Sequence, residues 1–255
     1  YKRKGVFYRD EEKQIVKFRD IQKGEEDFCW KFTELLPPEK SNKKKFENGI
    51  QIPNGDETRA ISCDSYSNSQ GGRKYGSKAC ALLGIKKEGH KKAVGMLYGR
   101  PKDKVELHNQ VMMAAEYWGC QAWYEHTSDD YLSHFRERGK IGYLGLYPII
   151  LIDPTKRAET QRYRGTPINP FSLTKQLDIG ITYFEEECDQ IDFEEILENA
   201  KKFDPYERTK FDIMVSFLIM LSCLSDIKPA LPPKPRPIIQ TFPANYQPQK
   251  QNSVM

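Results

Sequence analysis

The sequence has 255 residues, with 40 lysine and arginine against 36 aspartate and glutamate residues and a formal net charge of +4. That length suffices for one large domain or two small ones, and so small a net charge implies a polyanion partner only where basic residues cluster locally. The longest apolar run, residues 213–221, is shorter than the roughly 20 residues of a membrane span. The six cysteines lack the spacing of a zinc site.

The two ends of the chain differ in composition from its middle. Residues 1–56 are dense in charge, with the run EKSNKKKFENG at 39–49, and show little apolar periodicity outside 28–36. We expect them to form a linker or docking arm after a further domain of a longer protein. Residues 228–255 are rich in proline, which predicts an extended tail. The folded domain is therefore expected at 57–227.

Three short apolar segments separated by glycine- and lysine-rich turns predict an antiparallel meander. They are TRAISCD at 58–64, SKACALLGI at 77–85 and KAVGMLYG at 92–99. The next segment, 105–118, has apolar residues at helical spacing, and QAWYE at 121–125 predicts a fourth strand.

The remaining segments are mainly helical in pattern. Helices are expected at 129–139, where a glycine ends the pattern, and at 172–188, 193–203 and 207–224. The order of elements predicts an α/β fold, in which three antiparallel strands and then parallel strands form one mixed central sheet flanked by helices.

The stretch GGRKYGSK at 71–78 resembles a phosphate-binding loop but does not fit one. Such a loop requires G-x-x-x-x-G-K-[ST], whereas here Ser77 precedes Lys78. The loop must also lead into a helix, whose N-terminus binds the phosphates, and the following residues predict a strand. The basic pair Arg73 and Lys74 remains available for a phosphate backbone.

Three acids lie in apolar surroundings where carboxylates are unfavourable. Asp64 and Glu125 end predicted strands, and Asp212 lies in a predicted apolar helix. If the three converge, their mutual repulsion would be neutralised by Mg²⁺ or Mn²⁺, and two such ions support phosphodiester hydrolysis. Each acid also has a structural interpretation: a turn for Asp64, a helix cap or salt bridge for Glu125, and an ion pair with Arg208 for Asp212.

Further charged residues are weaker candidates. Asp129 and Asp130 follow Glu125 and are expected either to assist the metal ions or to cap the next helix. Basic residues near predicted turns are expected either to border a DNA track or to form a solvated face. These basic residues are Arg73, Lys74, Lys91, Lys92 and Arg100.

Several segments together resemble the C-terminal nuclease domain of bacteriophage terminase large subunits. The resemblance spans about 58–224 and rests on DSYSNSQGGRKYGSKACALLG, MLYGRPKDKVELHNQVMMAAEYWGCQAWYE, GTPINPFSLTKQLDIG and AKKFDPYERTKFDIMVSFLI. It implies a ribonuclease H-like fold. It also implies a two-metal-ion endonuclease that cuts concatemeric viral DNA, with Asp64, Glu125 and Asp212 as ligands of two Mg²⁺ or Mn²⁺ ions.

The same resemblance implies partners and a location. Those expected are double-stranded DNA, the portal protein, the terminase small subunit and a packaging ATPase domain, in the cytoplasm of an infected bacterium, with no membrane. The sequence departs from the family in having no Walker motifs, and in having Ser65 and Tyr66 where many relatives have Pro-Ala. A resolvase or integrase of the same fold, or a docking module without catalysis, is the alternative.

Overall fold

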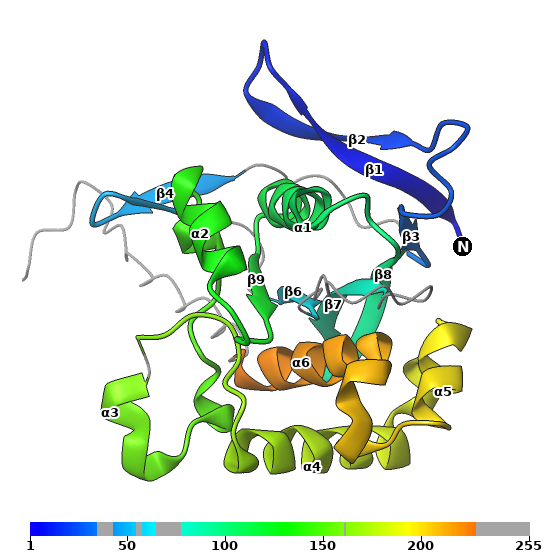
Figure 1. The fold of residues 1–255 in the computed structure, drawn as a ribbon, viewed down its shortest axis with the longest axis vertical. Coiled ribbons are helices and arrows are strands. Elements are labelled where there is room, and N and C mark those ends of the chain that lie inside the picture. Colours follow the sequence, from blue (N-terminus) through cyan, green and yellow to red (C-terminus); the bar gives the residue numbers. More distant parts are fainter. Residues whose placement is uncertain (35–42, 55–57, 65–77, 161, 228–255) are drawn as a thin grey trace, which may run out of the picture.

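A computed structural model of the chain describes residues 1–34, 43–54, 58–64, 78–160 and 162–227. Its centre is a seven-stranded mixed sheet with the strand order β2-β1-β3-β8-β7-β6-β9 (Figure 1). The strands of this sheet are β1 (Arg3–Asp10), β2 (Ile15–Asp20), β3 (Trp30–Phe32), β6 (Arg59–Cys63), β7 (Ala79–Lys87), β8 (His90–Gly99) and β9 (Gln121–Tyr124). A separate hairpin is formed by β4 (Lys44–Glu47) and β5 (Ile50–Pro53).

Helices lie on both faces of the sheet, with α1 and α2 on one side and α4, α5 and α6 on the other (Figure 1). The α-helices are α1 (Lys104–Trp118), α2 (Asp130–Glu137), α3 (Arg157–Thr160), α4 (Pro170–Glu186), α5 (Glu194–Ala200) and α6 (Asp212–Asp226). Short 3-10 helices occupy Ile141–Tyr143, Ile149–Leu151, Pro154–Lys156, Cys188–Gln190 and Pro205–Lys210. None of the helices in the described ranges combines the length and apolarity needed to cross a bilayer.

The predicted α/β class and the order of elements in the middle of the chain are confirmed. β6, β7 and β8 form the antiparallel meander, and β9 pairs in parallel with β6. The helix expected at 207–224 is instead divided, because Phe211 has non-helical backbone angles between a 3-10 helix and α6. Asp212 is therefore the first residue of its helix.

The expectation that residues 1–56 form a linker or docking arm is wrong for residues 3–32. Strand β3 pairs with β8, and β1 pairs with both β2 and β3, so this segment extends the central sheet. Phe7, Trp30 and Phe32 are buried in the core beneath α1. Charged side chains on the exposed positions of β1 and β2 conceal this alternation in the sequence.

Two polar contacts fix the N-terminal strands to α1. The backbone N–H of Phe7 donates to the Gln110 side chain, whose amide donates back to the Phe7 carbonyl, at 3.0 and 2.9 Å. The buried Glu116 carboxylate binds Arg9 and also Lys140, the latter at 2.6 Å. These contacts make residues 3–32 part of the same packed unit as the predicted domain.

The substitution Phe7→Ala tests this packing. The side chain is 1% exposed, so its truncation should lower the free energy of unfolding by about 3 to 5 kcal/mol. Tyr8→Ala is the matched control, because Tyr8 is 38% exposed and its loss should cost less than about 1 kcal/mol. Urea denaturation of both variants measures the difference; equal, small effects would mean that the N-terminal strands add no stability.

Candidate metal-binding active site

Asp64 and Glu125 meet at one edge of the sheet because β6 and β9 run parallel. The backbone N–H of Glu125 donates to the carbonyl of Cys63 at 3.4 Å. Ala60 and Trp123 belong to the core beneath α6. Asp64 lies four residues after Ala60 and Glu125 two after Trp123, so strand alternation directs both acids to the α6 side.

Asp212 reaches the same edge from the start of α6. Its carboxyl group shares a hydrogen bond with the Asp64 side chain and accepts another from the backbone N–H of Lys78. Asp64 is only 8% exposed. Burial raises the pKa of Asp212 from 3.8 to about 6, although the hydrogen bonds with Asp64 and Lys78 act in the opposite direction. The structure thus brings two of the three predicted acids into contact.

A buried serine holds the two acids in this arrangement. The Ser216 hydroxyl donates to the Cys80 carbonyl and accepts from the Asp64 backbone N–H, both at 2.9 Å. Ser216 lies one helical turn after Asp212, so both side chains are on the helix face toward β6 and β7. One hydroxyl therefore fixes α6 against two strands.

Glu125 lies at the same edge of the sheet as these acids, but its carboxylate forms an ion pair with Arg208. Its carboxylate accepts a hydrogen bond from Arg208 at 2.8 Å, and Arg208 also donates to the Gln176 side chain at 3.1 Å. The salt-bridge interpretation of Glu125 is thus correct, whereas the pairing of Arg208 with Asp212 is wrong. The break at Phe211 separates those two residues from a common α-helix.

The donor set fits one cation better than two. Asp64 and Asp212 are two desolvated carboxyls in contact, an arrangement suited to a hard divalent ion. Within the described part of the chain, however, no three His, Cys, Asp or Glu side chains are close enough to share a metal ion. Glu125 completes such a set only if its carboxylate leaves Arg208.

The two auxiliary acids have other partners. Asp129 contacts His126 at 3.3 Å, and Asp130 forms an ion pair with Lys104 at 2.8 Å. Asp129 occupies the N-cap position of α2 without making a side-chain capping hydrogen bond. Neither acid is brought to Asp64 by a contact of the described residues.

The predicted basic border is divided between two ends of the sheet. Lys92 pairs with Ile85 across the hairpin, six residues from the Ala79–Gly99 pair, which places it about 20 Å from the Asp64 edge. It forms ion pairs with Glu34 and Asp192 at 2.8 and 2.9 Å.

Lys91 lies at the same distant end, where its ammonium group contacts the Ser225 hydroxyl at 3.3 Å. Arg100 is different, because it is exposed and directly follows β8 at the edge near Asp64. Arg73 and Lys74 lie outside the described residues.

Three residues of the site were not predicted. Lys78 binds Asp212 through its backbone, Ser216 joins α6 to the strands, and Arg208 neutralises Glu125. The sequence contains a signal for Ser216, which interrupts an otherwise apolar run, but none for the long-range pairing of Arg208.

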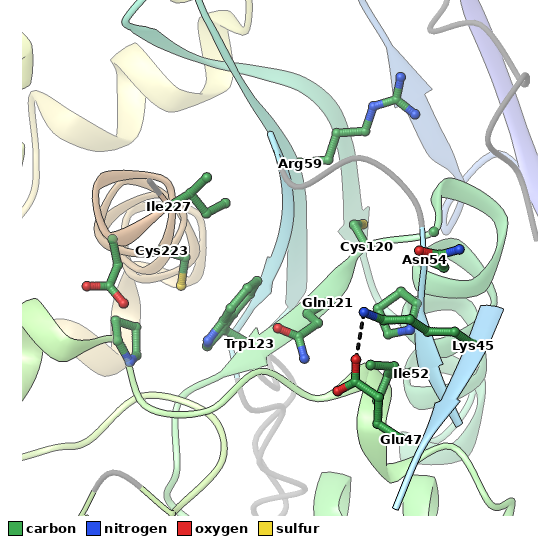
Figure 2. A pocket seen from close by; sticks show the side chains of 14 residues that line it. Lys45, Glu47, Ile52, Asn54, Arg59, Cys120, Gln121, Trp123, Cys223 and Ile227 are labelled. Carbon is green, nitrogen blue, oxygen red and sulfur yellow. Dashed lines mark ion pairs between the residues drawn. The ribbon is translucent and has the colours of Figure 1, made fainter. Parts of the chain in front are cut away.

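A cavity of about 390 Å³ lies at the N-terminal end of β6 and β9, opposite the end that carries the acids (Figure 2). Arg59 and Gln121 begin those strands, whereas the acids follow their ends. Three polar side chains of the cavity are engaged with other protein groups, since Gln121 donates to the Gly142 carbonyl and Lys45 pairs with Glu47. The cavity is separate from the acid cluster, because none of Asp64, Glu125 and Asp212 lines it.

Comparison with known proteins adds no assignment, because no family model and no curated protein matches this chain.

The substitution Asp212→Asn should stabilise the protein at pH 8 without divalent ions. The folded state retains the Asp212 proton up to about pH 6, whereas the unfolded chain releases it near pH 4, so wild-type stability falls as the pH rises between these values. Asparagine removes this cost and should raise the free energy of unfolding by roughly 1 to 3 kcal/mol at pH 8.

Urea denaturation at pH 8 and below pH 4 measures the effect, which should vanish at the lower pH. Asp178→Asn on α4, where the side chain is 56% exposed, is the control and should change little at either pH. A loss of stability at pH 8 in Asp212→Asn would contradict the conclusion that ionisation of the buried Asp212 destabilises the folded state.

Proposed function

We propose that this chain is a metal-dependent DNA endonuclease, the nuclease domain of a bacteriophage terminase large subunit. The observation that carries the proposal is the buried contact between Asp64 and Asp212 at the end of β6. Two desolvated acids in contact are unfavourable for the fold, and a divalent cation bound between them would relieve that cost.

A ribonuclease H-like fold is part of this proposal. The order β8-β7-β6-β9, with β9 parallel to β6, supports it. Further support comes from α6, which packs on β6 and β7 and brings Asp212 to the end of β6.

Asp64 and Asp212 are the residues that would hold Mg²⁺ or Mn²⁺. Such an ion polarises a phosphodiester and generates a nucleophile from water at neutral pH. The backbone N–H of Lys78 donates to the Asp212 carboxyl, and the Ser216 hydroxyl accepts from the backbone N–H of Asp64, which fixes the position of that residue. Glu125 is the proposed third ligand, and a second ion requires that its carboxylate release Arg208.

The proposed substrate is double-stranded concatemeric DNA in the cytoplasm of the infected bacterium. Lys78 and Arg100 supply positive charge at the acid edge of the sheet. The proposed partners are the portal protein, the terminase small subunit and a packaging ATPase domain. They follow from the sequence resemblance alone.

A docking module without catalysis is the second candidate. The ion pair between Glu125 and Arg208 favours it, because both side chains are at most 14% exposed and each neutralises the other without a metal ion. The two candidates differ in what the Asp64–Asp212 pair does, since only the nuclease requires these carboxylates for activity.

Incubation of the purified protein with supercoiled plasmid and MnCl₂ separates the candidates. The wild type and Asp178→Asn should nick and linearise the plasmid, and EDTA should abolish cleavage. Asp64→Asn and Asp212→Asn should each lower the rate at least about a hundredfold, because each removes a ligand carboxylate. Cleavage that survives both substitutions would overturn the nuclease assignment. So would the absence of cleavage by the wild type with every divalent ion tested.

A further inference from the structure

A second cavity of about 320 Å³ lies beside the acid edge of the sheet. This volume is within the range of about 300 to 1,000 Å³ that is usual for small-molecule sites. The lining comes from His126 after β9, from the segment between Tyr147 and Tyr163, and from the three residues that precede α4. The residues central to its chemistry are His126, Tyr147, Lys156, Tyr163 and Asn169.

Three rings form an aromatic wall in this cavity. The rings of Tyr147 and Tyr163 have centroids 5.8 Å apart, and His126 lies 5.9 Å from Tyr147. A hydrogen bond of 2.7 Å joins His126 to the Tyr147 hydroxyl, and the Tyr147 backbone N–H donates to the Tyr163 carbonyl at 2.8 Å. The wall is preorganised, while Tyr163 remains 44% exposed to a ligand.

Two basic side chains lie beside the aromatic wall. Arg162 lies over the Tyr163 ring at 5.7 Å, and Lys156 lines the cavity. Neither side chain, nor that of the neighbouring Arg157, forms an ion pair with any described residue. The carboxylate of Asp153 accepts hydrogen bonds from the Thr155 backbone and hydroxyl, so it is engaged within its own turn. Lys156 and Arg162 therefore bring two positive charges to the cavity border, where the Asp153 carboxylate supplies one negative charge that acts on Lys156.

The chain segment that carries Glu125 continues directly into the lining of the cavity. His126 directly follows Glu125, and its N–H donates to the Thr166 carbonyl at 3.1 Å. Glu125 and Thr166 form a parallel bridge, and Pro167, the next residue, lines the cavity. A ligand in the cavity thus lies one residue along the chain from a proposed metal ligand.

We propose that the cavity binds one unstacked nucleotide of the DNA substrate, with its base on the Tyr163 and Tyr147 rings and its phosphate at Lys156 and Arg162. Aromatic side chains beside a cationic track are the usual means of holding single-stranded nucleic acid without sequence preference. The choice of a nucleotide rests on the proposed nuclease function. The substrate at the moment of cleavage is then locally melted DNA.

Binding of a fluorescein-labelled ten-residue oligothymidylate, followed by anisotropy in EDTA, tests this site independently of cleavage. Tyr163→Ala should weaken binding about tenfold, and Tyr163→Phe should preserve it because the stacking face is retained. The matched control is Tyr8→Ala, whose side chain is 38% exposed on β1 and should leave binding unchanged. Binding of a blunt duplex of ten base pairs should be insensitive to Tyr163→Ala.

Three results would overturn the proposal: no binding of the oligothymidylate by the wild type, no loss in Tyr163→Ala, or an equal loss on the duplex. The plasmid assay separates this outcome from failure of the nuclease assignment. If the wild type cleaves plasmid and Tyr163→Ala binds the oligothymidylate as tightly as the wild type does, only the nucleotide site is refuted. A tenfold loss of oligothymidylate binding in a protein without cleavage activity would refute only the nuclease.

Discussion

The buried hydrogen bonds of Ser216 are the constraint on which the candidate site depends. A single hydroxyl contacts the first residue after β6 and a carbonyl of β7, and it is fully buried. Because Asp212 lies one turn earlier on α6, the same contact fixes the position of that acid beside Asp64. The sheet edge, the helix axis and the acid pair are thereby set together.

The site is costly for the fold, and its charges are balanced unequally. Burial raises the pKa of Asp212, so the pair resists full ionisation, whereas Glu125 has Arg208 as a counter-ion. A divalent cation would relieve the cost of ionising the Asp64–Asp212 pair, and it would compete with Arg208 for Glu125. Residues that weaken the folded state while concentrating charge in one place are typical of functional sites.

Much of this arrangement could be predicted from the sequence, for identifiable reasons. Short apolar runs marked β6, β7 and β8, and an acid at the end of such a run marked Asp64. The N-terminal strands were missed because β1 buries only Gly5 and Phe7 and has charged residues at both of its ends. The pairing of Arg208 with Glu125 joins residues 83 positions apart, and no local pattern predicts it.

Binding of Mn²⁺ at pH 8 is the most direct test that Asp64 and Asp212 form a cation site. The electron paramagnetic resonance signal of the free ion measures binding without any DNA or catalytic step. We predict that the wild type and Asp178→Asn remove this signal on titration, whereas Asp64→Asn and Asp212→Asn do not. Equal binding of Mn²⁺ by the wild type and both asparagine variants would contradict the assignment.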